Sequence, residues 1–234
     1  MALAACILLT LLTSQALASG FQVSPTRVQL DSDQRVMALT IRNTSERGVN
    51  IQVELMAWSQ ADDQDHYEPT SELLATPPIF SLEAGEQQII RVGLRRPPER
   101  GKELTYRLFL QELPPPTPDG FNGLQIVMRM GIPVFVAPAS GSASHDLDWQ
   151  LQRSEDGVLR LSASNFGNGH AQVNGLTLHR NGREVTPAGM FYVLPGSSRG
   201  WAIEDHALSN QEHPVTLRAN VSGEAFEAHL QAHQ

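Results

Sequence analysis

The side chains of this 234-residue chain that could do chemistry are eight histidines and 25 aspartates and glutamates. In His145-Asp146 and in Asp205-His206 a histidine has an aspartate as its direct neighbour, and such groups can act together as acid and base. Neighbouring residues of a strand point to opposite faces, so neither pair would form a dyad. The sequence contains no G-x-S-x-G, H-E-x-x-H or glycine-rich phosphate-binding motif. We therefore predict no catalytic site and no enzymatic activity.

Two further polar clusters could bind a ligand. The acidic run Asp62–His66 suggests calcium, but it lacks the glycine and the distal glutamate of a calcium loop, so we predict a solvated hairpin tip. The cluster Asn165–His170 (NFGNGH) could be a small polar binding loop. Asparagine and glycine readily adopt left-handed conformations, however, which favours a turn between two strands. We expect neither a metal nor a cofactor.

The elements that would position these residues are short β-strands. Apolar and polar residues alternate in MALTIRN, VNIQVELMAW, QIIRVGL, YRLFLQEL, LRLSASN and VTLRANV. Turn-forming residues separate these runs, for example at Glu83-Ala-Gly, Asn181-Gly and Pro195-Gly. No segment has the apolar stripe of an amphipathic helix. The pattern is typical of an all-β protein built from sandwiches.

The first residues indicate export. Residues 1–18 are an apolar run that ends in Ala16-Leu17-Ala18, a small-x-small cleavage site, and we interpret them as a cleavable signal peptide. Cys6 is the only cysteine, so the mature chain would have no disulfide and no thiolate metal site. The formal net charge of −8 argues against a nucleic-acid partner. No later segment is long and apolar enough to span a bilayer.

The mature chain divides into two halves. Residues 139–145 are rich in serine, alanine and glycine and are predicted to form a flexible linker. It would join an N-terminal domain of residues 19–138 to a C-terminal domain of residues 146–234. Each half carries about seven strand-like runs, the number that an immunoglobulin-like sandwich requires. We expect two such domains with a cleft between them.

Ordered motifs along the whole mature chain resemble the PapD-like periplasmic pilus chaperones. They include Ser24-Pro-Thr-Arg27, Thr76-Pro-Pro-x-Phe80, Glu83-Ala-Gly85, Glu103-x-x-Tyr106-Arg107, Leu124-Gln-Ile126, Asn165-x-Gly-Asn168-x-His170 and Tyr192-Val-Leu-Pro-Gly196. The resemblance implies a boomerang-shaped pair of immunoglobulin-like domains and a chaperone in the periplasm. Its partners would be pilus subunits, which are incomplete immunoglobulin-like domains, and an outer-membrane usher. No small-molecule substrate is implied.

The resemblance also explains a long apolar strand, GLQIVMRMGIPVFVAP, that follows a proline-rich loop. In this family the chaperone lends a strand to the subunit, which lacks its own last strand, and alternate apolar side chains fill the subunit's groove. Leu124, Ile126, Met128 and Met130 match the donated side chains. Read without the resemblance, the same stretch would be an ordinary sandwich strand with its apolar face in the core.

Arg27 matches the family's cleft arginine, which holds the C-terminal carboxylate of the subunit. The best-known branch adds a lysine at the position of Pro133, and proline supplies no charge. Arg107, on the adjoining strand, is the candidate replacement.

Glu103 matches a residue that bridges the two domains, although Ala137 stands where its usual arginine partner would be. These departures suggest the archaic, σ-type branch of chaperone–usher systems. The alternative is a structural pilus subunit or adhesin with immunoglobulin-like domains. Such a subunit would normally be a single incomplete domain.

Overall fold

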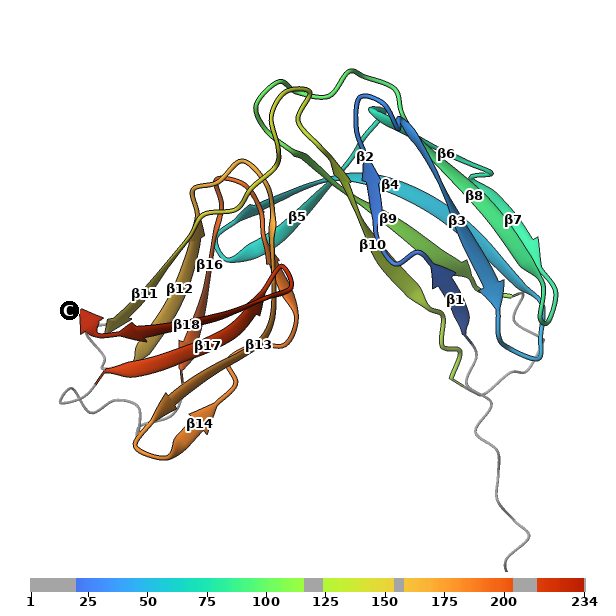
Figure 1. The fold of residues 1–234 in the computed structure, drawn as a ribbon. Coiled ribbons are helices and arrows are strands. Elements are labelled where there is room, and N and C mark those ends of the chain that lie inside the picture. Colours follow the sequence, from blue (N-terminus) through green and yellow to red (C-terminus); the bar gives the residue numbers. More distant parts are fainter. Residues whose placement is uncertain (1–19, 116–123, 154–157, 204–213, 234) are drawn as a thin grey trace, which may run out of the picture.

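The computed structural model describes residues 20–115, 124–153, 158–203 and 214–233, and these residues form strands, turns and loops without a helix. This confirms the predicted all-β class. The proposed signal peptide and the Asp205-His206 pair lie outside the described residues. Two β-sandwiches are set at an angle to each other, like the arms of a boomerang (Figure 1).

The described residues of the first sandwich form ten strands between residues 21 and 136. They are β1 (Phe21–Ser24), β2 (Val28–Leu30), β3 (Val36–Asn43), β4 (Val49–Ala61), β5 (Gln64–Pro69), β6 (Leu73–Thr76), β7 (Ile79–Leu82), β8 (Gln87–Leu94), β9 (Leu104–Leu113) and β10 (Arg129–Val136). One sheet has the order β1-β3-β8-β6, and the other has the order β2-β10-β9-β4-β5 with β7 on β4. The chain changes sheets between β1 and β2, and Arg27 lies in this crossing, immediately before β2.

The second sandwich is built in the same way from residues 147–233. Its strands are β11 (Leu147–Arg153), β12 (Leu159–Asn165), β13 (Ala171–Arg180), β14 (Arg183–Val185), β15 (Phe191–Val193), β16 (Ser198–Ile203), β17 (Val215–Val221), β18 (Glu224–Leu230) and β19 (Ala232–His233). The sheets have the orders β16-β12-β11-β19 and β14-β13-β17-β18, with β15 on β13.

Alternating strands explain both cores. On β4, for example, Val49, Ile51 and Val53 are buried while the residues between them are more exposed. Side chains that point inward from both sheets form one apolar core in each sandwich. A third, smaller apolar group lies between the sandwiches and consists of Trp58, Phe135, Tyr192 and Leu194. We call this group the interdomain cluster.

Candidate functional site

Two arginines flank Pro133 on the outer face of the larger sheet of the first sandwich. Pro133 on β10 lies directly opposite Arg107 on β9. On the other side of β10, Val134 pairs with Val28, and Arg27 directly precedes Val28. The neighbouring residues Val28 and Val134 are fully buried in the core, so the row beside them faces outward. We call Arg27, Pro133 and Arg107 the anchor row.

The guanidinium groups of the anchor row are available for a ligand. Within the described part of the chain, neither Arg27 nor Arg107 forms a hydrogen bond or an ion pair. The Arg107 Cζ atom lies 4.0 Å above the Trp58 ring, a cation–π contact that fixes the side chain without satisfying its N–H donors. A guanidinium presents these donors in a fork that matches a carboxylate.

The strand that carries Pro133 has an open edge. β10 pairs with β9 along its whole length, but it pairs with β2 only through Val134–Val136. Residues Arg129–Pro133 therefore have no strand partner on that side among the described residues. An open edge of this kind can accept a further strand.

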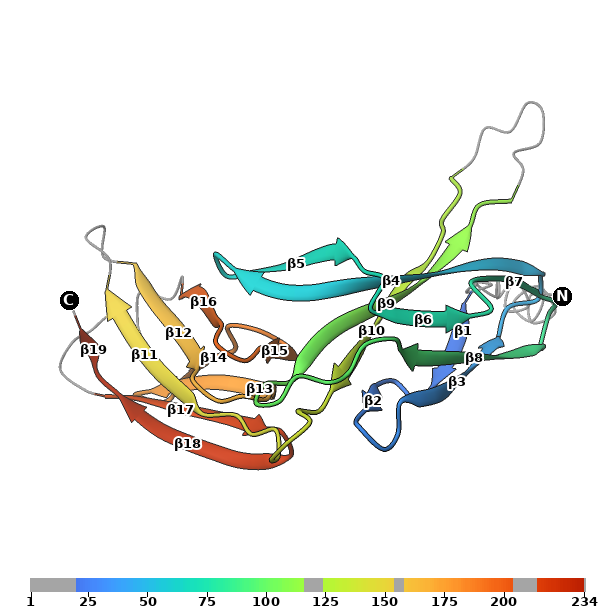
Figure 2. The same ribbon diagram turned by 90° about the horizontal axis from the view of Figure 1, so that it is seen from above.

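The predicted donor residues divide into two groups. Leu124 and Ile126 are 84% and 67% exposed, respectively. Met128 and Met130 are partly buried and pack against the core of the first sandwich. The expectation of one long exposed strand needs correction, because the strand begins only at Arg129. The ends of β9 and β10 next to this segment project beyond the rest of the first sandwich (Figure 2).

Glu112 explains why Met128 is less exposed than expected. The Glu112 backbone N–H donates to the Met128 carbonyl oxygen at 2.8 Å. The Met128 N–H in turn donates to the Glu112 carboxylate at 3.2 Å, and Arg47 pairs with the other carboxylate oxygen at 3.1 Å. This buried carboxylate fixes the chain at Met128 and leaves the residues before it outside the ladder.

Glu103 contacts the second sandwich through a histidine. Its carboxylate accepts the backbone N–H of His170 at 2.8 Å and lies 2.7 Å from the His170 Nδ1 atom. Both side chains are almost fully buried. The His170 ring stacks on Phe135 with centroids 3.5 Å apart. The partner of Glu103 is thus His170, whereas the resemblance implies an arginine at the position of Ala137.

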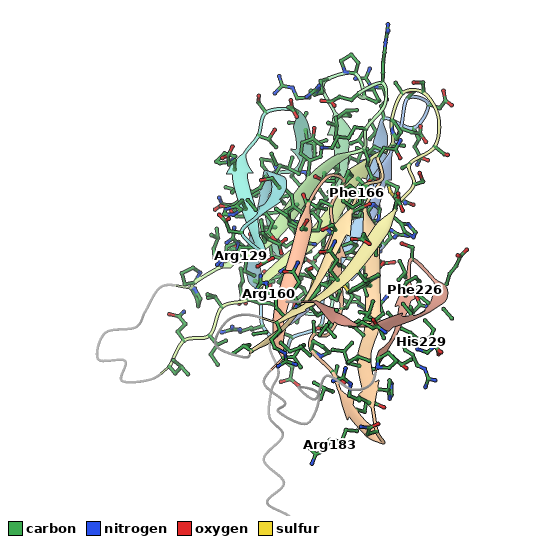
Figure 3. All side chains as sticks on the ribbon, turned by 90° about the vertical axis from the view of Figure 1, so that its left-hand side faces the viewer. Arg129, Arg160, Phe166, Arg183, Phe226 and His229 are labelled. Carbon is green, nitrogen blue, oxygen red and sulfur yellow. The ribbon has the colours of Figure 1, made fainter. Side chains whose placement is uncertain are left out.

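The β4–β5 hairpin makes a second contact between the sandwiches, because it reaches toward the second sandwich (Figure 1). Asp65 accepts two hydrogen bonds from Arg199, both at 3.1 Å. Asp63 pairs with Arg160 on β12, which is labelled in Figure 3. The predicted hairpin tip is therefore confirmed, but it is not merely solvated, because Asp63 and Asp65 contact the second sandwich. The arginines lie far away in sequence, so spacing within the acidic run gave no signal.

The Asp65 carboxylate accepts hydrogen bonds from Trp58, Gln60 and Arg199. Its partial burial would raise its pKa. Hydrogen bonds from Gln60 and Trp58 and the charge of Arg199 outweigh this effect, so the pKa lies below its usual value. Gln60 adds to this contact between the sandwiches. Its side-chain amide donates a hydrogen bond to the Tyr192 carbonyl oxygen and accepts one from the Leu194 N–H.

The glycines of the Asn165–His170 cluster have a different purpose from the predicted left-handed turn. Neither Gly167 nor Gly169 has a positive φ. A Cβ atom at Gly167 would lie 2.3 Å from the Ser144 carbonyl oxygen, and one at Gly169 would lie 2.8 Å from the Ala143 Cβ. Glycine is needed here because the chain that joins the sandwiches passes directly over the loop.

An open pocket of about 480 Å³ lies where the sandwiches meet. Its lining includes Arg27 and Gln29 from the first sandwich and Gln172, Asn174 and Asn220 from the second. The pocket places one guanidinium of the anchor row at a solvent-filled junction. A ligand could therefore touch both sandwiches at once.

Comparison with known proteins identifies the family. Residues 20–142 match the family model for the pili and flagellar-assembly chaperone, PapD N-terminal domain. The chain belongs to this family. The chaperone protein LpfB of Salmonella typhimurium is 26% identical over 189 residues, which are 79% of this chain and 78% of LpfB. These matches support a chaperone role in pilus assembly and leave the alternative of a pilus subunit or adhesin without support.

Solved structures show the same two-sandwich fold. A chain of the CsuC–CsuE chaperone–tip adhesion subunit complex, from archaic Csu pili of Acinetobacter baumannii, has a TM-score of 0.72 and 21% identity. The match covers 92% of this chain and 100% of that one. A chain of the Salmonella enterica SafA pilin–SafB chaperone complex has a TM-score of 0.62 and 17% identity over 91% and 94% of the two chains. The described residues contain no helix capable of crossing a membrane.

Proposed function

We propose that this pilus chaperone works in the periplasm without enzymatic activity. It binds a pilus subunit whose immunoglobulin-like domain lacks its last strand, supplies residues 124–133 in place of that strand, and delivers the subunit to an outer-membrane usher. The observation that carries the proposal is the surroundings of β10. Exposed Leu124 and Ile126 precede this strand, and one of its edges is open at Arg129–Pro133. The two arginines of the anchor row lie beside it and have no acidic partner among the described residues.

The donated side chains are those of the exposed segment. When residues 124–128 extend β10, Leu124 and Ile126 continue the face on which Met130 and Ile132 lie, because side chains alternate along a strand. Burial of each in a subunit groove would contribute roughly 1.5–3 kcal/mol before the cost of ordering the segment. Met128 and Met130 are flexible enough to follow the groove from their partly buried positions.

The anchor row fixes the register of the donated strand. Arg27 and Arg107 would hold the C-terminal carboxylate of the subunit, and Pro133 between them offers no competing charge. At about 3.3 Å per strand residue, the segment from Ile126 to Pro133 spans roughly 23 Å. A carboxylate held at one end would therefore determine which groove positions meet Ile126 and Leu124 at the other.

The remaining parts of the proposal concern domain organisation. Strands end at Val136 and resume at Leu147, which supports domains of residues 19–138 and 146–234 joined by residues 139–145. Glu103 would bridge them through His170. Pro133 and Ala137, together with the likeness in fold to CsuC, support placement in the archaic branch.

The proposal is tested by expressing the protein in a periplasm together with candidate pilus subunits and purifying it. We expect a small subunit to co-purify in a one-to-one complex and to be degraded when the chaperone is omitted. Equal subunit yields with and without the chaperone would contradict the proposal.

A further inference from the structure

Tyr192 is a buried tyrosine of the second sandwich that faces the anchor row of the first. Its ring lies 5.5 Å from Trp58 and 5.6 Å from Phe135, measured between ring centroids. Gln60 holds the Tyr192 carbonyl oxygen at 3.0 Å. The ring is only 7% exposed and is fixed on several sides. Its hydroxyl therefore has a defined position relative to the first sandwich.

The Tyr192 hydroxyl is free to donate to a ligand. No described residue forms a hydrogen bond with it, and it is not among the fully buried polar atoms that lack a partner, so it reaches solvent. The Arg107 Cζ atom lies 5.9 Å from the centre of the Tyr192 ring. Burial raises the pKa of Tyr192, and the positive charges of Arg27 and Arg107 oppose that rise. At neutral pH the phenol keeps its proton, and all three groups are donors.

We propose that the Tyr192 hydroxyl is a third donor to the terminal carboxylate of the bound subunit, beside Arg27 and Arg107. This inference rests on the proposed function. A carboxylate has two oxygens and about four lone-pair sites, so it can accept from two guanidiniums and one phenol. Glu103 forms no ion pair with either arginine, and its Oε2 atom accepts from His170 instead.

The proposal has a structural consequence for recognition. Arg27 and Arg107 belong to the first sandwich, whereas Tyr192 lies on β15 of the second. The carboxylate would therefore be held by both sandwiches, and its capture would depend on the angle between them. The interdomain cluster and the β4–β5 hairpin set that angle, because Trp58 and Gln60 contact Tyr192 directly.

The test is a measurement of affinity for the subunit that co-purifies with the wild-type chaperone. Tyr192→Phe removes only the hydroxyl and keeps the ring contacts. We expect binding to weaken about tenfold, as for the loss of a hydrogen bond to a charged group. Tyr67→Phe is the matched control. It removes a hydroxyl from a ring that packs on Phe109 and Trp58 in the same sheet, and binding should change less than twofold.

A second arm uses the same subunit with two glycines added to its C-terminus, which moves the carboxylate by roughly 7 Å. If Tyr192 contacts the carboxylate, Tyr192→Phe and wild-type chaperone should bind this extended subunit equally. An undiminished tenfold loss with the extended subunit would show that Tyr192 acts elsewhere and would overturn the inference.

The remaining outcomes separate this inference from the proposed function. Unchanged affinity of Tyr192→Phe, with weaker binding by Arg27→Ala, would overturn the role of Tyr192 and leave the two-arginine anchor intact. Unchanged affinity of both Tyr192→Phe and Arg27→Ala would overturn the anchor itself.

Discussion

Pro133 on β10 and Arg107 on β9 are direct partners in an antiparallel ladder, and Arg27 lies on the opposite side of Pro133. A residue without charge thus separates two cations on one face of the sheet. Neither cation has an acidic partner among the described residues, which is why we propose that the row holds the terminal carboxylate of a subunit. This arrangement sets the direction and the register of everything proposed to bind along β10.

Ile126→Asp should prevent recovery of the subunit. The change would place a carboxylate in an apolar groove, at a cost of several kcal/mol unless the group takes up a proton. Val127→Asp is the matched control, because on an extended chain the Val127 side chain points to the face opposite that of Ile126. Co-purification from the periplasm measures both variants, with circular dichroism to check folding. A well-folded Ile126→Asp variant with normal subunit yield would refute strand donation.

Arg27→Ala and Arg107→Ala should each weaken subunit binding about ten- to a hundredfold, since a hydrogen bond to a charged group is worth roughly 1.5–3 kcal/mol. The double variant should lose less binding free energy than the two single variants together, because the two guanidiniums share one ligand. Arg91→Ala, on the other sheet of the sandwich, is the control and should bind normally. Strictly additive losses, measured by titration calorimetry, would mean that the arginines hold different groups.

His170→Ala should loosen the junction between the sandwiches. The change leaves the buried Glu103 carboxylate with one hydrogen-bond partner fewer and removes the ring that stacks on Phe135. We therefore expect the free energy of unfolding to fall by about 1–3 kcal/mol. Phe166→Ala, at an exposed position of the same loop, should cost far less. Urea unfolding measures the difference. Equal stabilities of the two variants would show that the Glu103–His170 contact does not hold the sandwiches together.

The hydrogen bonds to Asp65 from Gln60 and Trp58, together with the charge of Arg199, should make the stability of the fold decrease at acid pH. The pKa of Asp65 is lowered in the folded protein, so its contribution is complete above the unfolded pKa and is lost as the pH falls through the lowered folded value. Between pH 5 and strongly acidic pH, the melting temperature of wild type should fall more steeply than that of Asp65→Asn. Asp33→Asn, at an exposed loop, should follow wild type. Parallel curves for wild type and Asp65→Asn would contradict this assignment.

The local alternation of apolar and polar residues was sufficient to predict the strands. Alternation in runs such as MALTIRN and QIIRVGL predicted β3 and β8, because burial of every second side chain is a property of neighbouring residues. The resemblance to the family singled out Arg27 and Glu103 from their motifs. Their positions at the junction could be seen only in the structure.

Contacts between distant residues were beyond the sequence. Neither the pairing of His170 with Glu103 nor that of Asp65 with Arg199 follows from spacing, because both depend on how one sandwich sits on the other. The partial burial of Met128 likewise depends on Glu112, which lies across the ladder. The glycines of the Asn165–His170 cluster were misjudged for the same reason, since the segment that they accommodate comes from elsewhere in the chain.

Hydrogen exchange of the chaperone alone and in complex with its subunit tests strand donation most directly. The backbone amides of residues 124–127 lie outside the ladder, and no second strand among the described residues pairs with the edge at Arg129–Pro133. We predict that mass spectrometry will show strong protection of peptides covering 124–133 in the complex, while peptides from β6 and β8 remain unchanged. Exchange of residues 124–133 at the same rate in the free and bound protein would contradict the account.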